Sequence, residues 1–155
     1  MNRLTQNETV RVGLNWGAIG GVAGFVSGLL GAFSAILIAG FIGYYCGKRA
    51  AGTARGESPG RGASAGLVAG CIATPVYVMG AAVGSTVAVR GLGMEEVART
   101  IEEWMGAPIT PDEAWLFFLL SLLVAAVVQA AVLVLFSTLG GALALRRRER
   151  EGMKQ

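Results

Sequence analysis

The sequence contains no histidine and only two cysteines, and charged residues make up only 15% of its 155 positions. Without histidine, metal-centred and histidine-based mechanisms lose their usual residues. Cys46 and Cys71 fall in or beside apolar runs, which does not suggest a disulfide framework. We expect each thiol to be a small buried apolar group, with palmitoylation of Cys46 at a membrane edge as the alternative. No cofactor, metal site or phosphate-binding loop is expected.

All aspartate, glutamate, lysine and arginine residues lie outside the long apolar runs. Proton-coupled carriers and voltage sensors normally place ionisable groups at membrane depth. Small four-helix drug exporters depend on a membrane-embedded glutamate, which has no counterpart here. An enzyme would need its catalytic residues in 90–114, where only carboxylates and Arg90 or Arg99 are available. The sequence therefore favours a protein without enzymatic activity.

Apolar residues are abundant. Hydrophobic side chains make up 54% of the chain and the mean hydropathy is +0.59, whereas about a quarter of a soluble domain is charged. We therefore expect one integral membrane domain over residues 1–155. Its predicted fold is all-α, a bundle of four transmembrane helices in two hairpins.

The stretch from Gly13 to Cys46 runs for 34 residues without a charged side chain. A hydrocarbon core about 30 Å thick needs about 20 apolar residues, so this stretch suits two short helices rather than one. It is also rich in glycine, which lets helices approach closely in lipid. We predict a helical hairpin with a glycine zipper and a turn near Gly31 to Ser34.

Further signals complete the predicted bundle. An amphipathic pattern over residues 92–106 predicts a helix in the outer loop. Thr110 precedes Pro111, and Glu113 follows three residues after the threonine, which is a capping box at the start of a helix. The predicted spans are residues 14–30, 35–47, 62–89 and 111–145.

Basic residues predict the orientation. The linker at 48–61 holds four of them and the 146–155 tail holds five, against two in residues 90–114. Because basic residues collect on the cytoplasmic side, we expect the linker and both termini in the cytoplasm. The protein would then be a multi-pass protein of the cell (inner or plasma) membrane. The arginines assigned to this topology are Arg146, Arg147 and Arg148.

Glycines recur at four-residue spacing, which gathers them on single helix faces. We expect these faces to pack helix against helix within the chain. The alternative is a seam between protomers of a homo-oligomer. The glycines assigned to packing are Gly17, Gly21, Gly24, Gly28, Gly43, Gly62, Gly66 and Gly70.

Gln129 stands at the midpoint of the last span, where an unpaired amide is costly. We expect it to hydrogen-bond a neighbouring helix near Thr74 or the carbonyl freed by Pro75, a bond that contributes about 0.6–2 kcal/mol. The alternative is that Gln129 lines a path or cavity for a small solute.

Three stretches carry a resemblance to known proteins. They are the first span with Trp16 near its start, the run from Ile38 to Tyr45, and the run from Gly62 to Gly70 after a short linker. Over about residues 13–80, this pattern resembles a group of small prokaryotic four-span, glycine-rich membrane proteins of unknown function. The resemblance implies a helical membrane bundle and no activity.

We therefore expect a structural or accessory protein of the lipid bilayer. Its partner would be a second copy of itself or a larger membrane complex, and neither nucleic acid nor metal is expected as a partner. The alternative is a small channel or transporter with a path lined by the Gln129 face and the glycine-rich helix faces.

Overall fold

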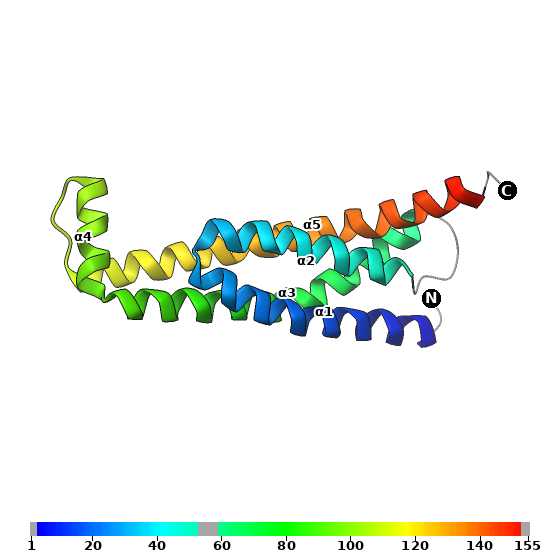
Figure 1. The fold of residues 1–155 in the computed structure, drawn as a ribbon, viewed down its shortest axis with the longest axis horizontal. Coiled ribbons are helices and arrows are strands. Elements are labelled where there is room, and N and C mark those ends of the chain that lie inside the picture. Colours follow the sequence, from blue (N-terminus) through cyan, green and yellow to red (C-terminus); the bar gives the residue numbers. More distant parts are fainter. Residues whose placement is uncertain (1–2, 53–58, 153–155) are drawn as a thin grey trace.

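The computed structural model describes residues 3–52 and 59–152, and within these ranges the chain forms helices and no strands (Figure 1). The all-α prediction is confirmed. Residues 53–58 of the linker, residues 153–155 of the tail and the side chain of Arg148 lie outside the described part. The helices are α1 (Arg3–Leu29), α2 (Ala32–Ala51), α3 (Pro59–Leu92), α4 (Met94–Met105) and α5 (Pro111–Gly152).

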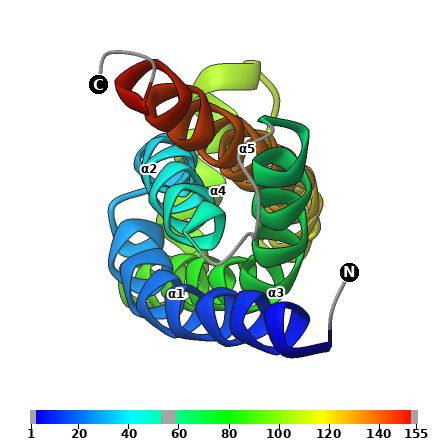
Figure 2. The same ribbon diagram turned by 90° about the vertical axis from the view of Figure 1, so that its right-hand side faces the viewer.

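The helices form a short hairpin, α1 with α2, and a longer one, α3 with α5. α1 packs mainly on α3, and α2 mainly on α5. The start of α1, the start of α3 and the ends of α2 and α5 lie at one end of the bundle (Figure 1). α3 and α5 continue past the α1–α2 turn to α4, which lies across the opposite end. Figure 2 shows the four long helices arranged around a common axis.

The α1–α2 turn is tight. α1 ends at Leu29 and α2 begins at Ala32, and between them Gly31 has a φ of +106°, a region that favours glycine. The Ser34 hydroxyl lies 2.7 Å from the carbonyl oxygen of Gly31 and 2.9 Å from that of Ser27, so it bridges the turn. The predicted helical hairpin is confirmed, but Ser34 belongs to α2 rather than to the turn.

All four long helices extend beyond the predicted spans. α1 begins at Arg3 rather than near residue 14, and α2 continues through Lys48 and Arg49. The apolar runs mark where side chains suit lipid, whereas the backbone stays helical until a turn interrupts it. Helix boundaries are therefore wider than hydropathy alone predicts.

Glycine brings the backbones of neighbouring helices into contact. Between α1 and α3, a Cβ at Gly24 would overlap the carbonyl oxygen of Tyr77. Between α2 and α5, a Cβ at Gly43 would overlap the carbonyl oxygen of Leu133. Packing at this distance depends on glycine, because any side chain would push the helices apart. Of the other glycines assigned to packing, Gly17, Gly21 and Gly28 face α3, and Gly62, Gly66 and Gly70 face α5.

The centre of the bundle is built of small side chains, while large apolar side chains point outward. Ala39, Ala69 and Ala73 are completely buried. Phe41 and Leu123, by contrast, are 68% and 63% exposed. A surface with this many large apolar groups is unusual for a monomer in water and suits a lipid environment.

Three of the described helices are long and apolar enough to cross a membrane, against the four expected. They are α1 over Asn7–Leu29, α3 over Gly60–Leu92 and α5 over Pro111–Arg147. α2 is not among them, and its last turn carries Lys48 and Arg49. Its uncharged part, residues 32–47, is about 24 Å long at 1.5 Å per residue.

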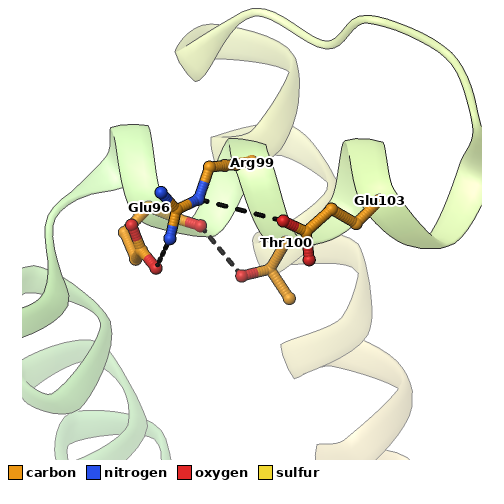
Figure 3. Close-up of polar contacts among 4 residues, drawn as sticks. All are labelled: Glu96, Arg99, Thr100 and Glu103. Atoms are coloured by element: carbon orange, nitrogen blue, oxygen red, sulfur yellow. Dashed lines mark hydrogen bonds and ion pairs between the residues drawn. The ribbon is translucent and has the colours of Figure 1, made fainter.

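The amphipathic helix expected over residues 92–106 is present as α4. On its polar face Arg99 lies between two carboxylates, 2.6 Å from Glu96 and 4.0 Å from Glu103 (Figure 3). These side chains are exposed, and such ion pairs contribute about 0.5 kcal/mol or less each. Trp104 is 89% exposed, so α3 and α5 cover only part of the apolar face of α4.

Candidate functional site

A pocket of about 340 Å³ lies where the α1–α2 hairpin ends between the longer arms of α3 and α5. The turn residues Gly28–Ala32 form one wall. The other walls come from α3 between Val78 and Leu92 and from α5 between Phe118 and Gln129. Because α3 and α5 continue past the turn, no further helix fills the space between them. The unequal length of the two hairpins therefore creates the pocket.

Small side chains keep the pocket open. On α5, Ser121 and Ala125 stand four residues apart in line with Gln129, so all three share one helix face. On α3, Ala81 and Ser85 have the same spacing and face the pocket from the opposite side. Two helices that present alanine and serine to each other leave space that larger side chains would fill.

Gln129 lies at the inner end of the α5 wall. The residue is only 4% exposed, and it makes no hydrogen bond with the described part of the chain. No fully enclosed side-chain nitrogen or oxygen among the described residues lacks a partner, so the Gln129 amide must border open space. Helical side chains lean toward the helix N-terminus, which on α5 is the direction of the pocket. The amide therefore faces the pocket that the residue lines.

The hydrogen bond expected between Gln129 and the region of Thr74 is not formed. The Thr74 hydroxyl donates instead to the carbonyl oxygen of Gly70 in its own helix, at 2.8 Å. Threonine in a helix commonly satisfies its hydroxyl in this way. The Thr74 hydroxyl on α3 therefore does not bond to the Gln129 amide, which faces the pocket.

Both serine hydroxyl groups of the pocket already donate a hydrogen bond. Ser85 donates to the carbonyl oxygen of Gly28 at 3.3 Å, and Ser121 donates to that of Phe118 at 2.8 Å. Their oxygens can still accept hydrogen bonds. Gln129 is therefore the lining side chain with free donors, and it also carries a free acceptor.

Tyr77, which was not among the predicted site residues, fixes the hairpin beside the pocket. Its side chain is completely buried, and its hydroxyl donates to the carbonyl oxygen of Ala35 on α2. The hydroxyl of Ser27 on α1 lies 3.4 Å from the Tyr77 hydroxyl oxygen. A buried phenol needs a hydrogen-bond partner, so a tyrosine in the middle of an apolar run was a usable signal. Tyr77 ties α3 to both helices of the hairpin.

Beyond Gln129, toward the termini, the bundle is closed. Ser137 on α5 donates a 2.6 Å hydrogen bond to the carbonyl oxygen of Gly66 on α3. A Cβ at Gly47 on α2 would overlap the carbonyl oxygen of Ser137. The backbones of α2, α3 and α5 thus meet around one serine, and the pocket ends at Gln129.

The remaining predicted residues lie away from the pocket. At the start of α5 the Thr110 amide donates to Glu113 Oε2 at 2.8 Å, and the Glu113 amide lies 3.3 Å from Thr110 Oγ1, which is a reciprocal cap. Arg146 and Arg147 are exposed near the other end of α5. None of these four residues lines the pocket.

The cysteines differ from each other. Cys46 is buried as expected, but Cys71 is exposed on α3, so its expected burial was wrong. An apolar run contributes residues to the outer surface as well as to the core, and Cys71 belongs to the outer surface. Hydrophobic neighbours in the sequence therefore do not imply burial in this protein.

A second pocket, of about 430 Å³, lies on the outside of the bundle between α2 and α5. Its walls are apolar and aromatic and include Ile36, Phe41 and Phe136. It contains no amide side chain, so it differs from the first pocket in the group that could orient a ligand.

Within the described residues, no three cysteine, aspartate or glutamate side chains gather as a metal site requires. The polar chemistry of the first pocket consists of one amide and two hydroxyl groups. No family model, curated protein or solved structure matches this chain.

Proposed function

We propose that this protein is a four-helix integral membrane protein with a structural or accessory role. The observation that carries the proposal is the distribution of side-chain size, with glycine and alanine between the helices and large apolar groups outside. In a bilayer this distribution allows close helix packing within the protein and van der Waals contact with lipid around it.

The proposal counts α2 as a short fourth span. α2 has 20 residues, a length of about 30 Å that equals the hydrocarbon thickness. Lys48 and Arg49 at its end can extend their charged groups to the aqueous boundary. The uncharged part of α2, at about 24 Å, is shorter than the hydrocarbon core of about 30 Å. The α1–α2 turn would therefore lie within the outer leaflet.

The proposed orientation places both chain ends in the cytoplasm. The ends of α2 and α5 and the start of α3 lie together (Figure 1), and they carry Lys48, Arg49, Arg61, Arg146 and Arg147. α4, with four glutamates, lies at the other end. Basic residues near span ends favour the cytoplasmic side.

An accessory role is favoured over a channel because the space next to Gln129 is closed on one side. The contacts around Ser137 fill the region through which a path to the cytoplasm would have to pass. The glycine faces are occupied within the chain, so a second copy or a larger partner would pack against bulky outer side chains. A pocket that is closed at its inner end suits binding of a small molecule rather than conduction of a solute.

Cysteine accessibility tests this proposal. In a Cys46→Ala, Cys71→Ala background, Glu102→Cys on α4 should react with a membrane-impermeant maleimide in intact cells. Arg147→Cys should react only after the membrane is opened. The reverse pattern, or recovery of the chain in the soluble fraction, would refute the proposal. Co-purification from native membranes would then identify a partner.

A further inference from the structure

We propose that the pocket at the α1–α2 turn binds one neutral lipid, an apolar molecule with a hydroxyl or carbonyl group that hydrogen-bonds to Gln129. The inference rests on the membrane placement proposed above and adds a ligand to it.

The first argument for a ligand is the Gln129 amide. Gln129 is 4% exposed, lines the pocket and has no hydrogen bond with the described residues. Its amide borders the pocket and has no partner in the described part of the chain, so a ligand or a water molecule in the pocket would complete its hydrogen bonds. Since Gln129 has both donors and an acceptor, it can bind a hydroxyl group through either, or a carbonyl group through its NH₂.

The second argument is the size and lining of the pocket, which suit a mainly apolar ligand. A volume of about 340 Å³ with mainly apolar walls and a few polar groups matches small-molecule sites in general. Water alone would satisfy the amide but would leave most of this apolar space without favourable contacts. An apolar body attached to the hydrogen-bonding group satisfies both parts of the site.

Charge excludes other lipid groups. The walls contain no lysine, arginine, aspartate or glutamate. An ionised phosphate or carboxylate placed beside Gln129 would therefore be buried without a counter-charge, which is strongly unfavourable. A neutral oxygen-containing group is the kind that this site accepts.

The rim of the pocket suits entry from the membrane. Leu30 and Leu92 line the pocket and are 73% and 67% exposed, so its edge is apolar and open. With the turn inside the outer leaflet, this edge faces acyl chains. A neutral lipid can then enter sideways without crossing water.

Photolabelling tests the proposal. The full chain in phosphatidylcholine nanodiscs is exposed to a long-chain alcohol with a photoactivatable group, and in parallel to the matched hydrocarbon without the hydroxyl. Labelled peptides are located by mass spectrometry. We expect the alcohol to label residues 118–129 and 78–92, with about three- to tenfold less labelling in Gln129→Leu, the loss expected for one hydrogen bond.

Three comparisons sharpen the test. Ala125→Phe fills the pocket and should abolish labelling there by both probes, while Ala131→Phe, a change at an exposed alanine of the same helix, should have no effect. Labelling of the second pocket near Phe136 should be the same in all variants. Gln129→Asn keeps the amide and should retain part of the alcohol labelling, and it replaces Gln129→Leu if that variant fails to fold.

Equal labelling of Gln129→Leu and the parent chain, or labelling spread evenly over the outer surface, would overturn the proposal. A chain that is recovered from membranes but not labelled in the pocket refutes this inference alone. A chain absent from the membrane fraction refutes the proposed function instead.

Discussion

The hydroxyl group of Ser137 on α5 donates a 2.6 Å hydrogen bond to the carbonyl oxygen of Gly66 on α3. The carbonyl oxygen of Ser137 lies against Gly47 on α2. One serine therefore joins three helices, and it does so at a point where only glycine allows the backbones to meet. Stability should depend strongly on these positions.

Ser137→Ala should lower the free energy of unfolding in mixed micelles by about 1 kcal/mol, since it removes a buried hydrogen bond between helices. Ser64→Ala is the control, because the Ser64 hydroxyl is exposed and donates within its own helix. Equal effects of the two changes would show that the bond to Gly66 contributes nothing.

Gly47→Ala should lower the free energy of unfolding by about 1–3 kcal/mol, because the new methyl group would push α2 away from α5. Gly91→Ala is the control, since no atom lies within 4 Å of a Cβ at that position. Alanine is the better helix former there and should be neutral or stabilising by up to about 1 kcal/mol. Denaturant titration followed by circular dichroism measures both.

Tyr77→Phe should cost about 1 kcal/mol of stability, because the hydrogen bond from the phenol to the carbonyl oxygen of Ala35 is lost while the ring remains. Tyr45→Phe, at a tyrosine that is 48% exposed, is the control. Amide hydrogen exchange should also become faster around the α1–α2 turn in Tyr77→Phe. Unchanged exchange at the turn would argue against a role for Tyr77 in fixing the hairpin.

Gln129→Leu should raise the stability of lipid-free protein by up to about 1 kcal/mol, since it replaces an amide that borders the pocket and has no partner in the described part of the chain by an apolar side chain. Thermal unfolding in detergent measures this, with Gln129→Asn as the control that keeps an amide. A loss of stability in Gln129→Leu would mean that the amide has a partner within the protein.

Thr110→Ala should destabilise the first turn of α5 by about 1 kcal/mol, because an N-cap hydroxyl and its exchange of hydrogen bonds with Glu113 are lost. Hydrogen exchange over residues 111–115 should accelerate while the middle of α5 stays protected. Thr100→Ala, whose hydroxyl donates to the carbonyl oxygen of Glu96 inside α4, is the control.

Much of the fold could be predicted from local signals. The charge-free run from Gly13 to Cys46 is too long for one helix, and it does fold as two with Gly31 between them. The capping pattern before α5 and the amphipathic period of α4 depend on neighbouring residues only, which is why they are visible in a single sequence. The extent of α1 and α2 was not predictable from hydropathy, because helix ends depend on turns rather than on lipid.

The site could be predicted only in part. Gln129 stood out because an amide is rare in an apolar helix, but its surroundings depend on how far the α1–α2 hairpin reaches along α3 and α5. That reach is set by contacts between residues distant in sequence, such as Gly28 against Ala81. Tyr77 and Cys71 show the same limit, since the sequence does not reveal which face of α3 is buried.

The unequal hairpins also make the bundle of long helices thinner toward α4. Near Lys48 and Arg146 its cross-section contains α1, α2, α3 and α5, whereas near Leu92 only α3 and α5 remain beside α4 (Figure 1). In the proposed orientation the protein displaces more lipid from the cytoplasmic leaflet than from the outer one. A body of this shape fits best where the cytoplasmic leaflet is convex, so local membrane curvature would influence where it accumulates.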